Sequence, residues 1–165
     1  MECNVHRLVS VALSFDAFVA RDPRTTHQLC AAMPLYNQLS YFLAAVNDRN
    51  NLSQPSLCGE VLMQQECVTK FRYENLGLGM ALNRFVTLEA RARGYKGISA
   101  CTDSKLLASN WMNPPVGRSH LVSNWIFEEL EFWDENRKVV MPYEYIGPRR
   151  GWKIWCDLTG ESEVS

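Results

Sequence analysis

The stretch that decides the fold spans residues 72–82 and has the sequence Arg-Tyr-Glu-Asn-Leu-Gly-Leu-Gly-Met-Ala-Leu. An apolar, strand-like run over residues 59–68 precedes it, and an amphipathic helix is predicted over residues 78–93. Gly77 and Gly79 lie at the turn between the two. A strand, a glycine-containing turn and a helix start together aim backbone N–H groups and the positive end of the helix dipole at one place. The stretch therefore predicts a phosphate-binding loop.

Two common phosphate loops do not fit this stretch. A P-loop requires Lys followed by Ser or Thr after its last glycine, whereas Met80 and Ala81 follow Gly79 here. A dinucleotide-binding fingerprint requires a third glycine, but this chain has Leu82 at that position. It also requires an acidic residue at the end of the next strand, and here that strand ends at Thr102. The nucleotide-triphosphate and dinucleotide interpretations are therefore weak.

Composition limits the remaining classes. A chain of 165 residues has the length of one domain, and its hydrophobic fraction of 47% supplies a sizeable core. The formal net charge of -1 gives no basic field for nucleic acid, and no apolar run is long enough to span a membrane. There is no signal-peptide pattern at the N-terminus. The six cysteines are single, with no CxxC pair, so we expect no metal site and a reducing, cytoplasmic location.

The other elements are predicted from periodicity and breakers. Within the helix at 78–93, one apolar stripe should face the core, namely Leu78, Ala81, Leu82, Phe85, Leu88 and Ala92, and the polar residues Asn83, Arg84, Thr87 and Arg91 should face solvent. Gly94 should end this helix in the left-handed conformation. The remaining expectations are strands at 7–20 and 95–102, helices at 34–47 and 119–130, an irregular segment at 103–118, and a hairpin of 138–146 and 152–158 about a turn at 147–151.

The same stretch resembles the acetyl-CoA-binding motif of the GNAT acyltransferase superfamily. That motif is a strand ending in Val, a short loop with aromatic and basic residues, and then Gln/Arg-x-x-Gly-x-Gly/Ala opening a helix. Here the strand ends at Val68, and the loop and helix start follow through Gly77 and Gly79. Residues 90–95 and 127–132 resemble later junctions of the family, so that the best-matched part is 59–158 within a single domain of 1–165, with 159–165 as a tail. The resemblance implies a mixed α/β GNAT fold that is short at the N-terminus.

Within the superfamily, the closest resemblance is to the arylalkylamine N-acetyltransferase-like branch of invertebrates. A helix at 34–47 before the central strand, Cys101-Thr102 at the end of the next strand, and the segment 140–145 suggest that branch. The resemblance implies transfer of acetyl from acetyl-CoA to a small primary amine by direct attack, in a monomer or weak dimer. It implies cofactor contacts from Cys67, Val68, Arg72, Glu74, Asn75, Leu76, Gly77, Leu78, Gly79 and Met80.

The resemblance also implies that a hydroxyl near the CoA sulfur protonates the departing thiolate. Our candidate is Ser123, with Ser119 one helical turn before it. The alternative is a purely structural role, in which Ser119 caps the predicted helix. Tyr143 and Tyr145 are alternatives, although strand aromatics are more often core residues. Among the tryptophans, Trp111 is the best candidate for an amine pocket.

Two residues depart from the family pattern. Glu74 occupies the position of Gln or Arg in the motif, and Glu131 stands where the family usually has Gly. Only about one strand precedes residue 21, whereas the family usually begins with a strand and helices that build the acceptor site. The alternative function is therefore a catalytically silent or truncated acyl-CoA-binding protein of the same fold.

Overall fold

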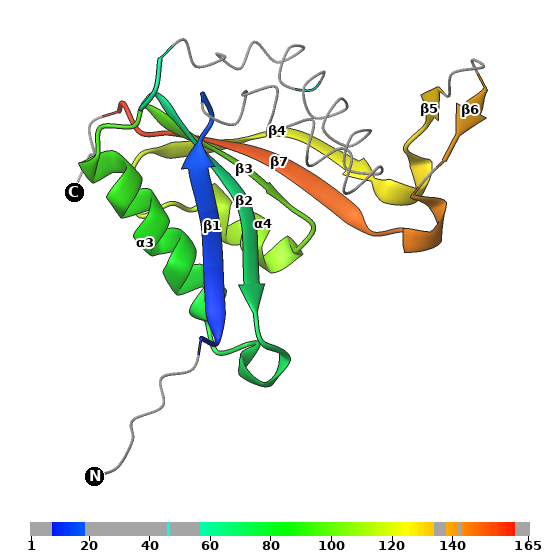
Figure 1. Ribbon diagram of the computed structural model, residues 1–165, viewed down its shortest axis with the longest axis horizontal. Coiled ribbons are helices and arrows are strands. Elements are labelled where there is room, and N and C mark those ends of the chain that lie inside the picture. The colour runs from blue at the N-terminus through cyan, green and yellow to red at the C-terminus, as the bar shows by residue number, and fades with distance from the viewer. Residues whose placement is uncertain (1–7, 19–45, 47–56, 134–137, 142, 161–165) are drawn as a thin grey trace.

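The structure is a computed structural model that describes residues 8–18, 46, 57–133, 138–141 and 143–160. Its main sheet has five strands in the order β1-β2-β3-β7-β4 (Figure 1). Their bounds are β1 Ser10–Asp16, β2 Val61–Thr69, β3 Gly97–Thr102, β4 Arg118–Ile126 and β7 Arg150–Asp157. No helix in the described part of the chain is long and apolar enough to cross a membrane.

The centre of the sheet is a β–α–β unit. β2 and β3 pair in parallel, and α3 (Leu78–Ala92) connects them, while every other pairing in the sheet is antiparallel. The predicted order of strand, glycine turn, helix and parallel strand is thus confirmed. Gly94 has φ +82°, so the predicted left-handed end of the helix is confirmed as well. The mixed α/β fold class follows from this unit and its antiparallel flanks.

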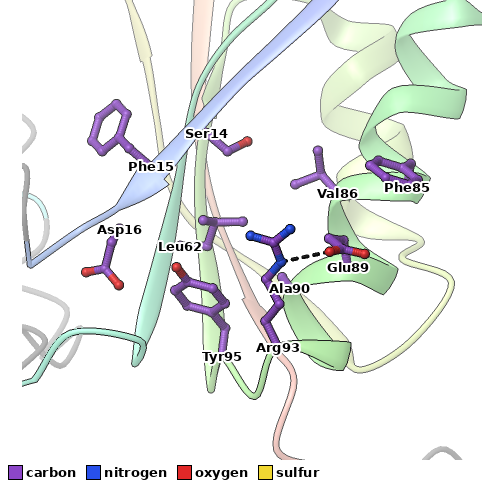
Figure 2. A pocket seen from close by; sticks show the side chains of 10 residues that line it. All are labelled: Ser14, Phe15, Asp16, Leu62, Phe85, Val86, Glu89, Ala90, Arg93 and Tyr95. Carbon is purple, nitrogen blue, oxygen red and sulfur yellow. Dashed lines mark hydrogen bonds and ion pairs between the residues drawn. The ribbon is translucent and has the colours of Figure 1, made fainter.

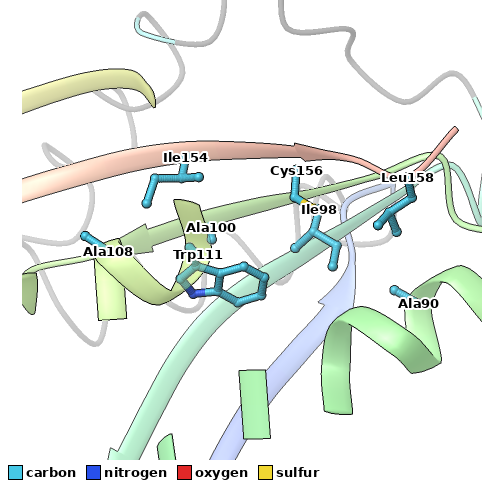
Figure 3. Packing of buried hydrophobic residues seen from close by; sticks show 8 residues of the cluster. All are labelled: Ala90, Ile98, Ala100, Ala108, Trp111, Ile154, Cys156 and Leu158. Atoms are coloured by element: carbon cyan, nitrogen blue, oxygen red, sulfur yellow. The ribbon is translucent and has the colours of Figure 1, made fainter. Parts of the chain in front are cut away.

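The main core lies between this sheet and two helices. Trp111 of α4 (Lys105–Met112) is 2% exposed and packs between the sheet and α3 (Figure 3). The buried members of the cluster are Ala90, Ile98, Ala100, Ala108, Trp111, Ile154, Cys156 and Leu158. α4 falls in the segment predicted to be irregular, so that expectation is wrong. Ser104 begins this helix by accepting a hydrogen bond from the Leu107 N–H at 3.4 Å.

The predicted helix at 119–130 is also wrong, because most of it is β4. Its apolar residues recur at helical spacing, but the cause is a β-bulge. Leu121 pairs with Ile154 and Ser123 pairs with Lys153, so Val122 is an extra residue in β4. One inserted residue shifts the alternation of a strand and makes it resemble the spacing of a helix. A 3-10 turn, Phe127–Glu129, follows β4.

The predicted hairpin of 138–146 and 152–158 does not form. β7 pairs with β3 on one side and β4 on the other, so neither edge is left for residues 138–146. That segment instead holds β6 (Val139–Val140), which pairs with β5 (Phe132–Trp133), and a 3-10 turn at Glu144–Ile146. The strand predicted at 7–20 is shorter than expected, and the helix predicted at 34–47 lies outside the described residues except for Val46, which is helical and buried.

One carboxylate fastens the end of β1 to the turn before β2. Asp16 accepts hydrogen bonds from the N–H groups of Gly59 at 2.5 Å and Phe18 at 2.8 Å. Burial raises the pKa of Asp16, but these backbone donors, together with Cys58 and Tyr95, outweigh it, so its pKa lies below the ordinary value of 3.8.

The lowered pKa gives a pH-dependent prediction. A carboxylate with a depressed pKa stabilises the fold above its unfolded-state pKa, and this stability is lost as pH falls through the folded-state value. Asp16→Asn should therefore unfold at a lower urea concentration than the wild type near neutral pH. The difference should shrink when urea unfolding is repeated below the ordinary pKa. A difference that is equally large in acid would show that the charge of Asp16 does not contribute.

Candidate functional site

β2 and β3 separate at the middle of the sheet. Their pairing begins where Val61 lies opposite Gly97 and ends where Gln64 lies opposite Ala100. Beyond this point β2 continues beside β1 alone, and β3 continues beside β7. A cavity of about 130 Å³ lies in this fork. It is lined by Gln64, Cys67, Cys101, Thr102, Asp103, Ser104, Leu107 and Trp111. Among the described residues, the second half of β2 therefore has no partner strand along the edge that faces the fork.

A β-bulge in β2 lies at the point where the strands separate. Leu13 pairs with Glu66 and Ser14 pairs with Gln64, so Gln65 is an extra residue in β2. After the bulge, the faces of the strand are exchanged relative to a regular strand. Cys67 and Thr69 consequently line the cavities on the side of α3 and α4. A strand without this bulge would place Cys67 on the same face as Val61 and Met63.

The glycine-containing turn forms a second cavity of about 290 Å³ next to the fork. It is lined by Cys67, Thr69, Tyr73, Glu74, Asn75, Gly77, Leu78, Gly79, Met80, Ser104, Leu106 and Leu107. Asn75 and Gly77 have φ values of 61° and 77°, which turn the backbone into α3. No side chain caps the start of α3, and the first bond of the helix is Ala81 N–H to Gly77 O at 2.9 Å. The N–H groups of Leu78, Gly79 and Met80 therefore have no acceptor within the helix.

Gly79 allows the start of α3 to lie close to its neighbours. A Cβ at this position would stand 3.3 Å from Leu107 Cδ2 and 3.6 Å from Cys67 Sγ. The glycine therefore lets α3 approach both α4 and β2 at the junction of the two cavities. A larger side chain would press against Leu107 and Cys67, which line both cavities.

Most of the predicted cofactor residues come together, and three do not. Val68, Arg72 and Leu76 line neither cavity, and Val68 and Leu76 are 55% and 67% exposed. Lys70 is exposed as well and lines neither cavity. Glu74 is thus the one acidic or basic residue among those that line the cavity at the turn. The positive potential there comes from the backbone and the helix dipole, not from side chains.

The two predicted proton donors do not reach these cavities. Ser119 pairs with Cys156 and Ser123 pairs with Lys153, and the intervening bulge puts the two serines on opposite faces of β4. Neither lines the fork or the turn cavity. Ser104 does line both, although sequence analysis placed it in an irregular segment. Its position as the capping serine of α4 was the signal that could have identified it.

The two cysteines of the fork have different surroundings. Burial raises the pKa of both the Cys67 and the Cys101 thiols. Lys153 opposes this effect at Cys101, which it faces across the β3–β7 pair. The Lys153 side chain is buried, and its Nζ donates to Ser99 Oγ at 2.5 Å. At neutral pH both thiols are therefore neutral and apolar in character.

A third cavity, of about 280 Å³, lies between β1 and the end of α3 away from the turn (Figure 2). Its lining includes Asp16 and Tyr95 on one side and the ion pair of Glu89 with Arg93, at 2.7 Å, on the other. Phe85 and Leu62 supply apolar surface. None of the residues predicted to bind the cofactor lines it.

Comparison with known proteins identifies the fold. No family model matches the chain, and no curated protein sequence matches it. Among solved structures, it is similar to the C-terminal condensation domain of Ebony in complex with beta-alanyl-dopamine, with a TM-score of 0.66, 16% identity, and coverage of 92% of this chain and 67% of that one. It is also similar to arylalkylamine N-acetyltransferase 2 from Aedes aegypti, with a TM-score of 0.64, 15% identity, and coverage of 96% and 71%.

This chain has the GNAT acyltransferase fold. Drosophila melanogaster polyamine N-acetyltransferase is a third neighbour, with a TM-score of 0.60 at 16% identity, covering 93% of this chain and 72% of that one. The GNAT fold predicted from the glycine turn and its flanking elements is thus confirmed.

Proposed function

We propose that the protein is an acetyl-CoA-dependent N-acetyltransferase that acts on a small primary amine of the arylalkyl class in the cytoplasm. The observation that supports this most is the fork between β2 and β3, which opens beside the uncapped start of α3. Acyl-CoA has an amide-containing arm and a pyrophosphate, and these two features suit the two parts of the site.

The two parts of the site have separate binding roles. The N–H groups of Leu78, Gly79 and Met80 would bind the pyrophosphate at the helix start. The free edge of β2 after Gln64 would pair with the amides of the pantetheine arm, as an added strand does. The arm would pass between the two cavities beside Cys67 and Leu107, which line both of them and lie next to Gly79. The thioester would then lie in the fork.

The chemistry follows from that placement. A backbone N–H near Val68 would polarise the thioester carbonyl as its oxygen becomes negative. The neutral amine would attack this carbonyl, the new C–N bond would form as the C–S bond breaks, and the amine nitrogen would release one proton to solvent. CoA would leave as a thiolate that takes up a proton. Ser104 is the hydroxyl that lines both cavities, and we assign it the proton-donating role that sequence analysis gave to Ser123.

One observation favours the alternative of a silent acyl-CoA-binding protein. Glu74 is a carboxylate at the turn cavity, and no Lys or Arg of the described residues lines that cavity to offset it. A carboxylate beside a pyrophosphate weakens the binding of the cofactor.

A two-stage assay separates these functions. Thermal denaturation with CoA and acetyl-CoA measures binding, and release of free thiol from acetyl-CoA with tyramine or serotonin measures transfer. Stabilisation together with amine-dependent thiol release supports the enzyme. Stabilisation without turnover supports the silent binder, and no stabilisation at millimolar CoA contradicts both.

The charge at the turn gives a direct prediction. Glu74→Arg should tighten CoA binding several-fold, because it replaces a repulsive carboxylate with a cation at the mouth of the cavity. Isothermal titration with CoA measures the change, and the gain should decrease with added salt. The matched control is Glu128→Arg, which makes the same charge change at a residue that lines neither cavity. An equal gain in both variants would mean that only net charge matters.

A further inference from the structure

The outward side of α3 is apolar. We call Ala81, Phe85, Leu88 and Ala92 the α3 stripe, and all four are exposed, with Phe85 62% and Leu88 44% accessible to solvent. The spacing of three and four residues places them in one row along the helix. The helical periodicity of the sequence predicts that these residues lie in the core. That expectation is wrong, and Figure 2 shows Phe85 on the side of α3 away from the strands, whereas Val86 points toward them.

The opposite side of α3 carries small and polar side chains, and it faces the sheet. Asn83, Thr87 and Ala90 are each 1% exposed. Thr87 Oγ1 donates to the Asn83 carbonyl at 2.8 Å, and neither polar atom of the Asn83 side chain has a hydrogen-bond partner. Small residues let the helix lie close to β1 and β2. Within the described part of the chain, the α3 stripe therefore takes no part in the core, and a row of exposed apolar residues on a helix is typical of an interface.

The charges beside the stripe specify the partner. Arg84 lies on one flank of the stripe and Glu89 on the other. In a parallel pair of helices, Phe85 and Ala92 occupy a positions, Ala81 and Leu88 occupy d positions, and Arg84 and Glu89 are the g and e residues. In a parallel pair, a g residue of one helix contacts the e residue of the other helix whose number is five higher. Arg84 of each copy would therefore contact Glu89 of the other copy, which gives two equivalent ion pairs.

An antiparallel pair is disfavoured by the same residues. In that orientation each flank meets the same flank of the partner, so Arg84 and Arg91 would face the arginines of the second copy. Like charges across an interface oppose association. Glu89 already forms an ion pair with Arg93, and the two side chains are 41% and 68% exposed, respectively. Exposed ion pairs contribute little free energy, so Glu89 can also bind a second arginine at little cost in stability.

We propose that two copies of this chain associate through parallel α3 helices about a two-fold axis, with the α3 stripe at the centre and reciprocal Arg84–Glu89 ion pairs at its edges. Such an interface is isologous and closes on itself as a dimer. It covers the mouth of the cavity between β1 and α3, which Phe85, Glu89 and Arg93 help to line. It leaves the glycine turn and the fork free.

Sedimentation equilibrium of the full chain tests association. The mass should rise with protein concentration from the monomer value of 18.9 kDa toward twice that value. Phe85→Glu should keep the monomer mass throughout, with an unchanged circular dichroism spectrum. Leu57→Glu, at an apolar residue that is 65% exposed on another surface, is the matched control and should still dimerise. A constant monomer mass for the wild type, or equal losses in both variants, overturns the proposal.

Charge reversal tests the orientation. Arg84→Glu and Glu89→Arg should each raise the dissociation constant several-fold, and the double variant should restore it, because it exchanges the two members of each ion pair. A tighter dimer with Arg84→Glu would indicate the antiparallel pair. Failure of the double variant to restore association would also overturn the proposal.

A disulfide gives an independent test of the register. Ala92→Cys should form a disulfide-linked dimer on mild oxidation, because equivalent a positions face each other in a parallel pair. The wild type, which keeps its native cysteines, is the control. Cross-linking no greater than that of the wild type would contradict the parallel register.

Discussion

Gly77→Glu should abolish CoA binding. Gly77 has φ 77° and lines the cavity at the turn, and its carbonyl accepts the first hydrogen bond of α3. The left-handed backbone is less favourable for glutamate than for glycine by about 1–2 kcal/mol. The substitution also adds a second carboxylate beside Glu74, at a cavity that no Lys or Arg of the described residues lines. Titration with CoA should show no detectable heat, and the thermal shift with CoA should disappear.

Gly94→Glu is the matched control for this variant. Gly94 has φ 82°, and a Cβ there would meet no atom within 4 Å, so the same substitution imposes a similar backbone cost far from the turn. It should lower the melting temperature about as much as Gly77→Glu while CoA binding persists. Unchanged CoA affinity in Gly77→Glu would remove the turn from the binding site.

Gly117→Ala should have the largest effect on stability. Gly117 precedes β4 with φ 81°, and a Cβ at this position would overlap the carbonyl oxygen of Asp157 on β7. Backbone atoms of a central strand cannot shift as a flexible side chain does. Left-handed strain and overpacking together should cost about 2–5 kcal/mol, a large part of the ~5–15 kcal/mol that stabilises an ordinary domain.

Gly59→Ala separates the effect of left-handed backbone strain from the effect of the overlap with Asp157. Gly59 has φ 87°, but a Cβ there would meet no atom within 4 Å, so its alanine variant carries the strain without the overlap. Urea unfolding should show a loss of about 1–2 kcal/mol for Gly59→Ala and a clearly greater loss for Gly117→Ala. Equal losses would mean that the carbonyl of Asp157 moves aside freely.

The sequence was sufficient where local signals agree. A strand-like run precedes the turn, Gly77 and Gly79 follow it, and Gly94 ends the helix, so strand, turn, helix and parallel strand were all predictable. The extra residues Gln65 and Val122 were not, because a bulge is defined by the partner strand and leaves no clear mark in its own strand.

In the candidate site, too, residues placed by local sequence were predictable and residues placed by packing were not. Residues of the turn, such as Asn75 and Gly79, line the predicted cavity because they are neighbours in the chain. Ser104 joins them only through the packing of α4, and Ser123 is displaced by the bulge at Val122, so neither position follows from local sequence. The exposed α3 stripe was mistaken for core because an apolar row shows that a helix has a partner surface but does not show which surface that is.

The bulge at Gln65 decides which side chains of β2 line the fork. Gln64 lies opposite Ser14 and Cys67 lies opposite Ala12, so the extra residue puts Gln64 and Cys67 on one face of the strand although they are three positions apart. Deleting Gln65 would leave a regular ladder with the same partners on β1, and Cys67 and Thr69 would still face the cavities that they line now. The chemical lining of the cleft would thus survive a single-codon deletion at this point.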